Sequence, residues 1–207
     1  MKNMKKLIDI LKEKKYKTDK WTDHYYVQDL YESLFEKYQN KKVNVLEIGV
    51  WNGESMKLWH DYFVNADNVV GIDIFERSSL EEVSGWLKGY DVKLHKFNSH
   101  KDTDKFLEFV ETYEEGFDII IDDGSHWYEN QINTYKKFSR LMRPGGVYVI
   151  EDLSFTVPES LYKVFTLTPE GGKEVLKPVI EREIPEIKFQ LTGGEMFKNQ
   201  PVGIIHF

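Results

Sequence analysis

Apolar and polar positions along this chain follow two spacings in turn, which predicts strands separated by helices. Short continuous apolar runs predict buried strands, whereas apolar residues three and four positions apart predict amphipathic helices. The runs that predict strands are VNVLEIG, VVGIDIF, VKLHKF, FDIIIDD and VYVIEDL, which begin at residues 43, 69, 92, 117 and 147. Strands that alternate with helices form parallel βαβ units with right-handed crossovers. The pattern therefore predicts an α/β fold with a Rossmann-like, doubly wound sheet.

The helical spacing occurs between these strands and also ahead of the first one. Apolar stripes predict helices over residues 4–11, 27–38, 80–87, 106–113 and 132–142. Thr22 or Asp23 is a plausible N-cap for the second helix, because its side-chain oxygen can accept a backbone N–H. Ser78 and Glu81 have the spacing of a capping box for the third. The Pro-Gly-Gly run at 144–146 predicts a turn into the fifth strand.

The carboxyl-terminal part departs from this alternation. A helical or irregular piece is expected around residues 160–177. Residues 186–207 predict two strands around a connection with glycines and a proline, hence an antiparallel hairpin at one edge of a mostly parallel, seven-stranded sheet. Residues 1–40 are expected to form a helical segment that packs on or caps a domain of residues 41–207. Without a repeat or a linker, the whole is expected to be one structural domain.

Composition narrows the classes of function. The formal charge of −7 at pH 7 disfavours a general nucleic-acid-binding surface. The absence of cysteine excludes disulfides and thiolate metal sites, and it fits a cytoplasmic protein. No apolar run approaches the about 18 residues of a membrane-spanning helix. The lysines of the first helix could attract an anionic partner, although a solvated helix face is the simpler interpretation.

Candidate chemistry gathers where two predicted strands end. Asp122, Asp123 and His126 follow one strand, and Glu151 and Asp152 end the next. In open α/β sheets ligands bind at this edge. Carboxylates packed together raise one another's pKa unless a cation joins them, and a hard divalent ion such as Mg²⁺ prefers oxygen ligands. The absence of cysteine and the scarcity of nearby imidazoles argue against zinc. Acidic loop residues that face water are the alternative.

His126 and Asp122 have two interpretations each. With an ordinary pKa of about 6.5, His126 could accept a proton from a substrate, or it could be a structural loop residue. Asp122 precedes Asp123 on an extended strand, so its side chain is expected to point the other way, toward a cofactor or backbone amides.

A second motif predicts a cofactor cradle. Gly49 and Gly53 lie where the first strand turns into a helix, the place of a nucleotide-binding loop. A dinucleotide fingerprint would need a glycine at Trp51, and the acidic Glu47 suits an amine-bearing ligand better than a phosphate. Asp73 ends the second strand, where a carboxylate can bind a ribose diol. These residues favour a nucleoside-type cofactor, with a plain strand–helix turn as the alternative.

Four segments together resemble a known family. They are TDK…DHYY before the first strand, LEIGVWNG with GIDIF, FDIIIDDGSH, and RPGGVYVIEDL, within residues 18–153. They resemble the class I S-adenosylmethionine-dependent methyltransferases, closest to the macrolide sugar O-methyltransferases of the mycinamicin and tylosin type and the cephalosporin-hydroxylase-like group. The run at 98–102 departs from the family by having Ser99 where an acid is usual.

The resemblance implies a metal-assisted O-methyltransferase that modifies a hydroxyl of a sugar or similar small polyol. It implies S-adenosylmethionine and Mg²⁺ or another hard divalent cation as cofactors. The catalytic residues would be His126, as general base, and Asp123, and the metal ligands Asp123, Glu151 and Asp152. The expected cofactor-binding residues are Glu47, Gly49, Trp51, Gly53, Asp73, Asn98, Ser99, Asp122, His24 and Tyr25.

Two other functions compete with this one. An NAD-dependent oxidoreductase would use the same kind of sheet, but Trp51 and the terminal hairpin disfavour it. A non-catalytic cofactor-binding module of the same fold is the other alternative. The expected partner is a small-molecule sugar or glycoside, without nucleic acid or membrane, and the amphipathic first helix offers a surface for a homo-oligomer.

Overall fold

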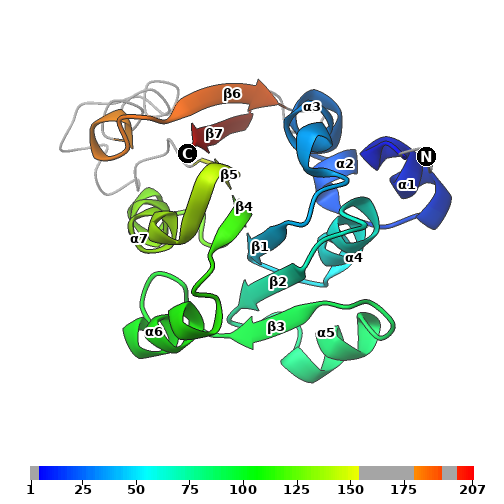
Figure 1. The fold of residues 1–207 in the computed structure, drawn as a ribbon, viewed down its shortest axis with the longest axis horizontal. Coiled ribbons are helices and arrows are strands. Elements are labelled where there is room, and N and C mark those ends of the chain that lie inside the picture. Colours follow the sequence, from blue (N-terminus) through cyan, green and yellow to red (C-terminus); the bar gives the residue numbers. More distant parts are fainter. Residues whose placement is uncertain (1–4, 154–179, 193–199) are drawn as a thin grey trace, which may run out of the picture.

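The computed structural model of the chain describes residues 5–153, 180–192 and 200–207, which form one sheet with helices on both faces (Figure 1). The strands are β1 (Asn44–Ile48), β2 (Asn68–Asp73), β3 (Lys93–Lys96), β4 (Phe117–Asp122), β5 (Met142–Ile150), β6 (Lys188–Thr192) and β7 (Gln200–His206). Their order in the sheet is β3-β2-β1-β4-β5-β7-β6. Pairs among β1 to β5 are parallel, whereas β7 is antiparallel to both β5 and β6. The predicted Rossmann-like sheet with a terminal hairpin is confirmed.

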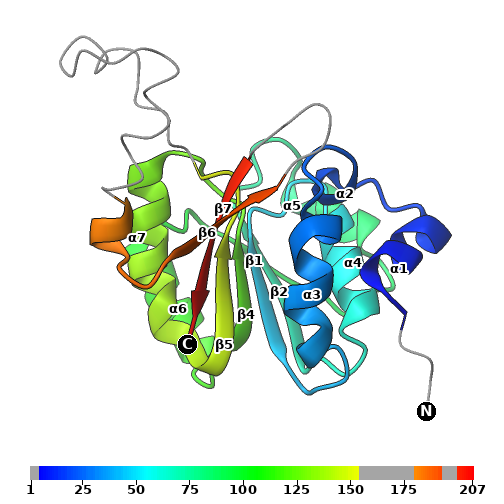
Figure 2. The same ribbon diagram turned by 90° about the horizontal axis from the view of Figure 1, so that it is seen from above.

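Helices cover both faces of the sheet. The α-helices are α1 (Leu7–Lys14), α2 (Asp19–Thr22), α3 (Glu32–Phe35), α4 (Glu54–Tyr62), α5 (Leu80–Trp86), α6 (Thr103–Thr112) and α7 (Tyr128–Phe138). A π-helical turn, Val27–Tyr31, precedes α3, and short 3₁₀ turns follow α3 and α7 at Glu36–Tyr38 and Ser139–Leu141. Figure 2 shows α6 and α7 on one face, with α1 to α5 on the other.

The central strand β4 contains the continuous apolar run Ile119 to Ile121, and its two faces show why the run is continuous. Ile119 and Ile121 pack into the core beneath α1 to α5, whereas Ile120 packs into the core beneath α6 and α7. Successive side chains of a strand point to opposite faces. Because helices cover both faces here, every position of the run must be apolar.

Two helix starts differ from the predictions. Ser79, and not Ser78, caps α5: its hydroxyl accepts the N–H of Glu82 at 3.2 Å, and the Glu82 carboxylate accepts the N–H of Ser79 at 2.8 Å. The helix predicted over residues 27–38 begins with the π-helical turn, whose N-cap is Tyr26 without a side-chain hydrogen bond, so the prediction of Thr22 or Asp23 as its N-cap is wrong. The reason is that Thr22 and Asp23 end a separate short helix, α2, whose own N-cap is Thr18.

The fifth strand also begins earlier than predicted. β5 starts at Met142 and includes the Pro-Gly-Gly run, with an irregular register opposite Phe117 and Ile119. A side chain at Gly146 would lie 2.6 Å from the Met142 side chain and 2.8 Å from the backbone oxygen of Asp118. The glycine therefore lets the strand pass close to β4 instead of turning before it.

The amino-terminal helices lie against the sheet domain. Leu7 and Leu11 of α1 share a core with Met56 and Trp59 of α4. The division into residues 1–40 and 41–207 stays a prediction, and the piece expected at 160–177 lies outside the described residues. Within the described ranges, no helix combines the length and the apolar character needed to cross a membrane.

Candidate active site

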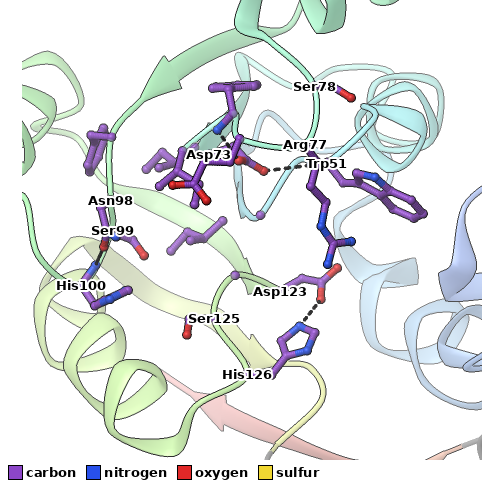
Figure 3. A pocket seen from close by; sticks show the side chains of 18 of the residues that line it. Trp51, Asp73, Arg77, Ser78, Asn98, Ser99, His100, Asp123, Ser125 and His126 are labelled. Carbon is purple, nitrogen blue, oxygen red and sulfur yellow. Dashed lines mark hydrogen bonds and ion pairs between the residues drawn. The ribbon is translucent and has the colours of Figure 1, made fainter.

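The carboxyl ends of β1, β2, β4 and β5 meet at one edge of the sheet. Backbone hydrogen bonds continue past the strand ends, from the N–H of Asp123 to the Ile48 oxygen at 2.8 Å and from the N–H of Glu151 to the Asp122 oxygen at 2.9 Å. A cavity of about 490 Å³ opens at this edge, and Figure 3 shows the residues that line it. The predicted acidic strand ends and the predicted cofactor loop therefore lie at the same edge of the sheet.

The turn after β1 is built around Gly49 and Asp73. Gly49 has a φ of +94°, and a Cβ there would lie 2.0 Å from the backbone oxygen of Asp123, so only glycine fits. The Asp73 carboxylate accepts the N–H groups of Val50 and Trp51 at 2.8 and 2.9 Å, and that of Phe75 at 2.7 Å. A carboxylate has about four lone-pair positions, so Asp73 keeps capacity for another donor.

Half of the predicted cofactor-binding residues line this cavity. Those that line it are Gly49, Trp51, Asp73, Asn98 and Ser99. Glu47, Gly53, Asp122, His24 and Tyr25 are not among its lining residues. Glu47 is fully buried, and its carboxylate accepts the Ser55 hydroxyl at 2.7 Å. Ser99 lies with its hydroxyl 3.3 Å from that of Thr134.

Several residues that the sequence did not single out complete the wall. Phe75, Phe97, Ile48 and Ile72 make it partly apolar. Arg77 comes from the loop after β2, with its guanidinium carbon 5.9 Å from the centre of the Trp51 ring. In Figure 3 this side chain points from the loop toward Asp123. The sequence offered one indication that Arg77 lies at the site, which is its position four residues after Asp73 on the loop that follows β2.

Asp123, His126 and Asp152 form the group that can hold a metal ion among the described residues. One atom from each lies within 4.8 Å of the others. The Nε2 of His126 is 3.3 Å from Asp123 Oδ1 and 3.8 Å from Asp152 Oδ2. Two carboxylate oxygens on the open side of a half-buried rim suit a hard divalent ion, with water or substrate oxygens as further ligands. The residues present therefore fit such an ion.

Glu151, the third predicted ligand, is not part of this group, and its carboxylate is bound by Lys20. The Lys20 ammonium lies 2.7 Å from Glu151 Oε2, 2.6 Å from Asp123 Oδ2 and 3.3 Å from Glu47 Oε1. Burial by itself lowers the pKa of Lys20, but the three carboxylates outweigh it and hold that pKa well above its ordinary value. Sequence reasoning gave Lys20 no role, although it belongs to the TDK motif.

The segment from His24 to Tyr31, which begins within the DHYY motif, holds the carboxylates of Glu151 and Asp152. The Tyr31 hydroxyl donates to Glu151 Oε1, and the Tyr26 hydroxyl donates to Asp152 Oδ1. His24 stacks on the Tyr26 ring and has its Nδ1 3.6 Å from Asp152 Oδ1. The segment therefore orients the carboxylates, while its predicted contact with the cofactor stays a prediction.

Electrostatics couple His126 to its neighbours. The hydrogen bond to Asp123 raises the pKa of His126 above its ordinary value, and the charges of Asp123 and Asp152 add to this. Burial by itself would raise the pKa of Asp123, but the charge of Lys20 and the bond to His126 hold it below its ordinary value. The pair therefore favours an imidazolium beside a carboxylate.

Asp122 gives a test of this electrostatic picture. It is buried, and burial raises its pKa to about 7. A group whose pKa is raised on folding stabilises the fold below its unfolded pKa, and this contribution is lost as the pH rises through about 7. We expect the difference in melting temperature, wild type minus Asp122→Asn, to decrease as the pH rises from 4 to 8.

Thermal unfolding followed by circular dichroism across this range measures the effect. Asp104→Asn, an exposed position on α6, is the matched control, and its difference from wild type should not change with pH. Parallel pH profiles of wild type and Asp122→Asn would mean that Asp122 is already ionised near pH 4.

Comparisons with known proteins agree with this geometry. Residues 46–153 match a family model described as a methyltransferase domain. The chain is 32% identical over 146 residues to 8-demethyl-8-(2-methoxy-alpha-L-rhamnosyl)-tetracenomycin-C 3'-O-methyltransferase of Streptomyces olivaceus, covering 67% of this chain and 35% of that protein. It is 34% identical over 146 residues to demethylmacrocin O-methyltransferase of Streptomyces fradiae, covering 67% of this chain and 34% of that protein.

Among solved structures, the fold is similar to that of MycE, a methyltransferase of the mycinamycin biosynthetic pathway in complex with Mg, SAH and mycinamycin VI. The TM-score is 0.70 at 24% identity, and the match covers 99% of this chain and 55% of that one. The chain spans about a third of the length of the curated relatives that it matches.

Proposed function

Because this chain belongs to the methyltransferase-domain family, we propose that it transfers a methyl group from S-adenosylmethionine to a hydroxyl of a sugar or similar small polyol. The family membership agrees with the resemblance that its motifs indicate. The observation that carries the proposal is the juxtaposition of the cavity with the Asp123–His126–Asp152 group at the same sheet edge. The curated relatives are named as O-methyltransferases of glycosylated compounds, which supports a sugar acceptor.

The cavity has the size and chemistry for the methyl donor. Its volume of about 490 Å³ lies in the range of small-molecule sites. Asp73 would accept a ribose hydroxyl with its remaining lone pair, and Asn98 and Ser99 would lie near the adenine. Arg77 would pair with the carboxylate of the methionine part, because a guanidinium matches a carboxylate in geometry and charge. The Trp51 ring beside it would cover the ligand from the solvent side.

Asp123 and Asp152 would hold a divalent cation, Mg²⁺ in the first instance, with His126 beside it. Such an ion acts as a Lewis acid that lowers the pKa of a bound hydroxyl. The protein contributes the fixed positions of the two carboxylates, whose other oxygens are bound by Lys20 and Tyr26. Glu151 is already bound to Lys20 and Tyr31, so it would become a ligand only if Lys20 moved away.

His126 would act as the general base. As the acceptor oxygen forms its bond to the methyl carbon and the bond from carbon to sulfur breaks, the hydroxyl proton passes to Nδ1 of His126, while Nε2 keeps its hydrogen toward Asp123. Asp123, 3.3 Å from Nε2, stabilises the imidazolium that results. The half-exposed position of His126 at the cavity mouth gives an acceptor access to it. Alignment of oxygen, carbon and sulfur supplies much of the acceleration in such displacements.

A methyl-transfer screen tests the proposed function. Incubation with S-adenosylmethionine, Mg²⁺ and a panel of glycosides and sugar nucleotides should release S-adenosylhomocysteine with at least one acceptor. Reduction of nicotinamide, read by its absorbance, would instead favour an oxidoreductase. Calorimetric binding of S-adenosylmethionine without turnover on any acceptor would favour the non-catalytic module.

A further inference from the structure

A second cavity adjoins the first on the side of the amino-terminal helices. Its volume of about 370 Å³ lies in the range of small-molecule sites. Asp19 and Trp51 line both cavities, and the lining of the first also includes Asp123 and His126. The other lining residues of the second cavity lie within residues 11–23, which comprise the end of α1, the connection between the two helices, and α2. A ligand in the second cavity would therefore lie next to the proposed reaction site.

Three lysines line the second cavity. They are Lys12, Lys15 and Lys17, and each of them is exposed. Among the described residues none of the three takes part in an ion pair, whereas Lys14 of α1 pairs with Asp61 at 3.8 Å. Because the protein as a whole has a formal charge of −7, three ammonium groups at one cavity are a local departure from its charge. They favour an anionic ligand at this place.

Aromatic rings and carboxylates line the same cavity. The rings are those of Trp21 and Trp51, and the carboxylates are those of Asp19 and Asp23. Trp51 is 46% exposed, so its indole ring is available to a ligand. The apolar face of a sugar ring packs on an aromatic ring, and sugar hydroxyls donate hydrogen bonds to carboxylates. These side chains therefore suit the sugar part of a ligand, while the lysines suit its anionic part.

The backbone of Trp51 is held in a conformation that a large side chain rarely adopts. Its φ is +47°, in the left-handed region. Asp73 fixes this conformation, because its carboxylate accepts the N–H of Trp51 at 2.9 Å. Strained backbone of this kind is concentrated at ligand-binding sites. The strain at Trp51 therefore supports a ligand-binding role for the indole that lies between the two cavities.

Contacts to α4 hold the second cavity in shape. Leu11 and Tyr16, both buried, form its apolar base. The Tyr16 hydroxyl donates to the Asp61 carboxylate at 2.8 Å, and the N–H of Lys17 donates to the Glu54 carboxylate at 2.8 Å. The connection after α1 is thus tied to α4 at two points. A ligand would not have to order this segment on binding, which favours affinity.

We propose that the second cavity binds the phosphate group of a phosphorylated sugar, and that such a sugar is the acceptor of methyl transfer. A phosphate monoester carries about two negative charges and three acceptor oxygens, so each of the three lysines has an oxygen to bind. Trp21 and Trp51 would pack on the sugar ring, and a hydroxyl beyond them would reach His126. The inference rests on the proposed methyl transfer and narrows its acceptor from sugars in general to phosphorylated ones.

A comparison of a charged with a neutral sugar tests the inference. We expect wild type to bind glucose 1-phosphate at least about tenfold more tightly than methyl glucoside, because hydrogen bonds between ammonium and phosphate are charge-assisted. Both affinities are measured by calorimetry in EDTA, so that an ion bound at Asp123 contributes nothing. Uridine diphosphate glucose is titrated in parallel, and binding tighter than that of the monophosphate would identify the phosphorylated acceptor as a sugar nucleotide.

Removal of the lysines should abolish the preference for the phosphate. A variant that combines Lys12→Gln, Lys15→Gln and Lys17→Gln should bind both sugars with similar affinity, and the exposure of these side chains favours a retained fold. Lys14→Gln is the matched control, because this lysine of α1 is not among the lining residues and should leave the preference unchanged. Trp21→Ala should weaken binding of both sugars, because its ring would contact the part that they share.

The outcomes separate this inference from the proposed reaction. Equal affinity of wild type for the two sugars, or an unchanged preference in the triple lysine variant, would overturn it. S-adenosylhomocysteine should not displace the sugar phosphate, since it would occupy the first cavity, and displacement would place the phosphate there instead. Methyl transfer to neutral glycosides but to no phosphorylated sugar would overturn the inference and leave the proposed function in place. Because the main readout is binding without turnover, failure of the methyl-transfer screen is a separate result.

Discussion

Replacing His126 by alanine is expected to lower kcat by roughly 10²–10⁴-fold, the usual contribution of a positioned general base. The imidazole lies at the cavity mouth, 3.3 Å from the Asp123 carboxylate that would stabilise it after protonation. Affinity for S-adenosylmethionine should change little, because the nucleoside part is expected to bind on the Asp73 side of the cavity. Steady-state kinetics with the acceptor found in the screen, together with calorimetry of cofactor binding, measures both quantities.

The pH profile adds an independent readout for His126. Only the neutral imidazole accepts a proton, so the wild-type rate in Mg²⁺ should increase with pH as His126 loses its proton. His126→Ala should lose this rise. His60→Ala on α4, outside the cavity, is the control and should keep both rate and profile. A near-wild-type rate for His126→Ala would assign the imidazole a structural role.

Removal of divalent ions by EDTA is expected to abolish methyl transfer, and excess Mg²⁺ should restore it. Asp123 Oδ1 and Asp152 Oδ2 present two oxygens toward one space beside His126. Without an ion, a sugar hydroxyl keeps a pKa far above neutrality, and His126 alone is too weak a base to remove its proton efficiently. The rate of S-adenosylhomocysteine release, with and without chelator, is the measurement.

Cofactor binding provides the control for the chelation experiment. S-adenosylmethionine should bind with similar affinity in EDTA, because its ribose is expected at Asp73, which ends β2, whereas the proposed ion ligands Asp123 and Asp152 follow β4 and β5. Loss of both binding and turnover would point instead to unfolding of the rim. Full turnover in chelator would remove the metal from the mechanism and leave His126 and Asp123 as the remaining catalytic pair.

Much of the fold was predictable because its signals are local. The strand runs matched β1 to β7, and the apolar stripes matched α1, α3, α5, α6 and α7, because burial on one or both faces imposes a spacing of apolar residues that is visible within each segment. The cap of α5 was off by one residue because two serines adjoin there, and the cap predicted for the helix over residues 27–38 was wrong because Thr22 and Asp23 end α2 instead. The Pro-Gly-Gly run entered β5 because β4 offered it backbone partners.

By itself, the sequence determined the sheet and the edge at which its acidic residues meet, because chain order and apolar period place strand ends together in a parallel fold. Only the tertiary structure decided which carboxylate oxygens face the cavity. Lys20 lies more than a hundred positions before Asp123 and Glu151, and Tyr26 and Tyr31 are similarly remote from their partners. Contacts between residues so far apart in the chain do not appear as a spacing pattern in the sequence. They form only when the amino-terminal helices pack against the sheet.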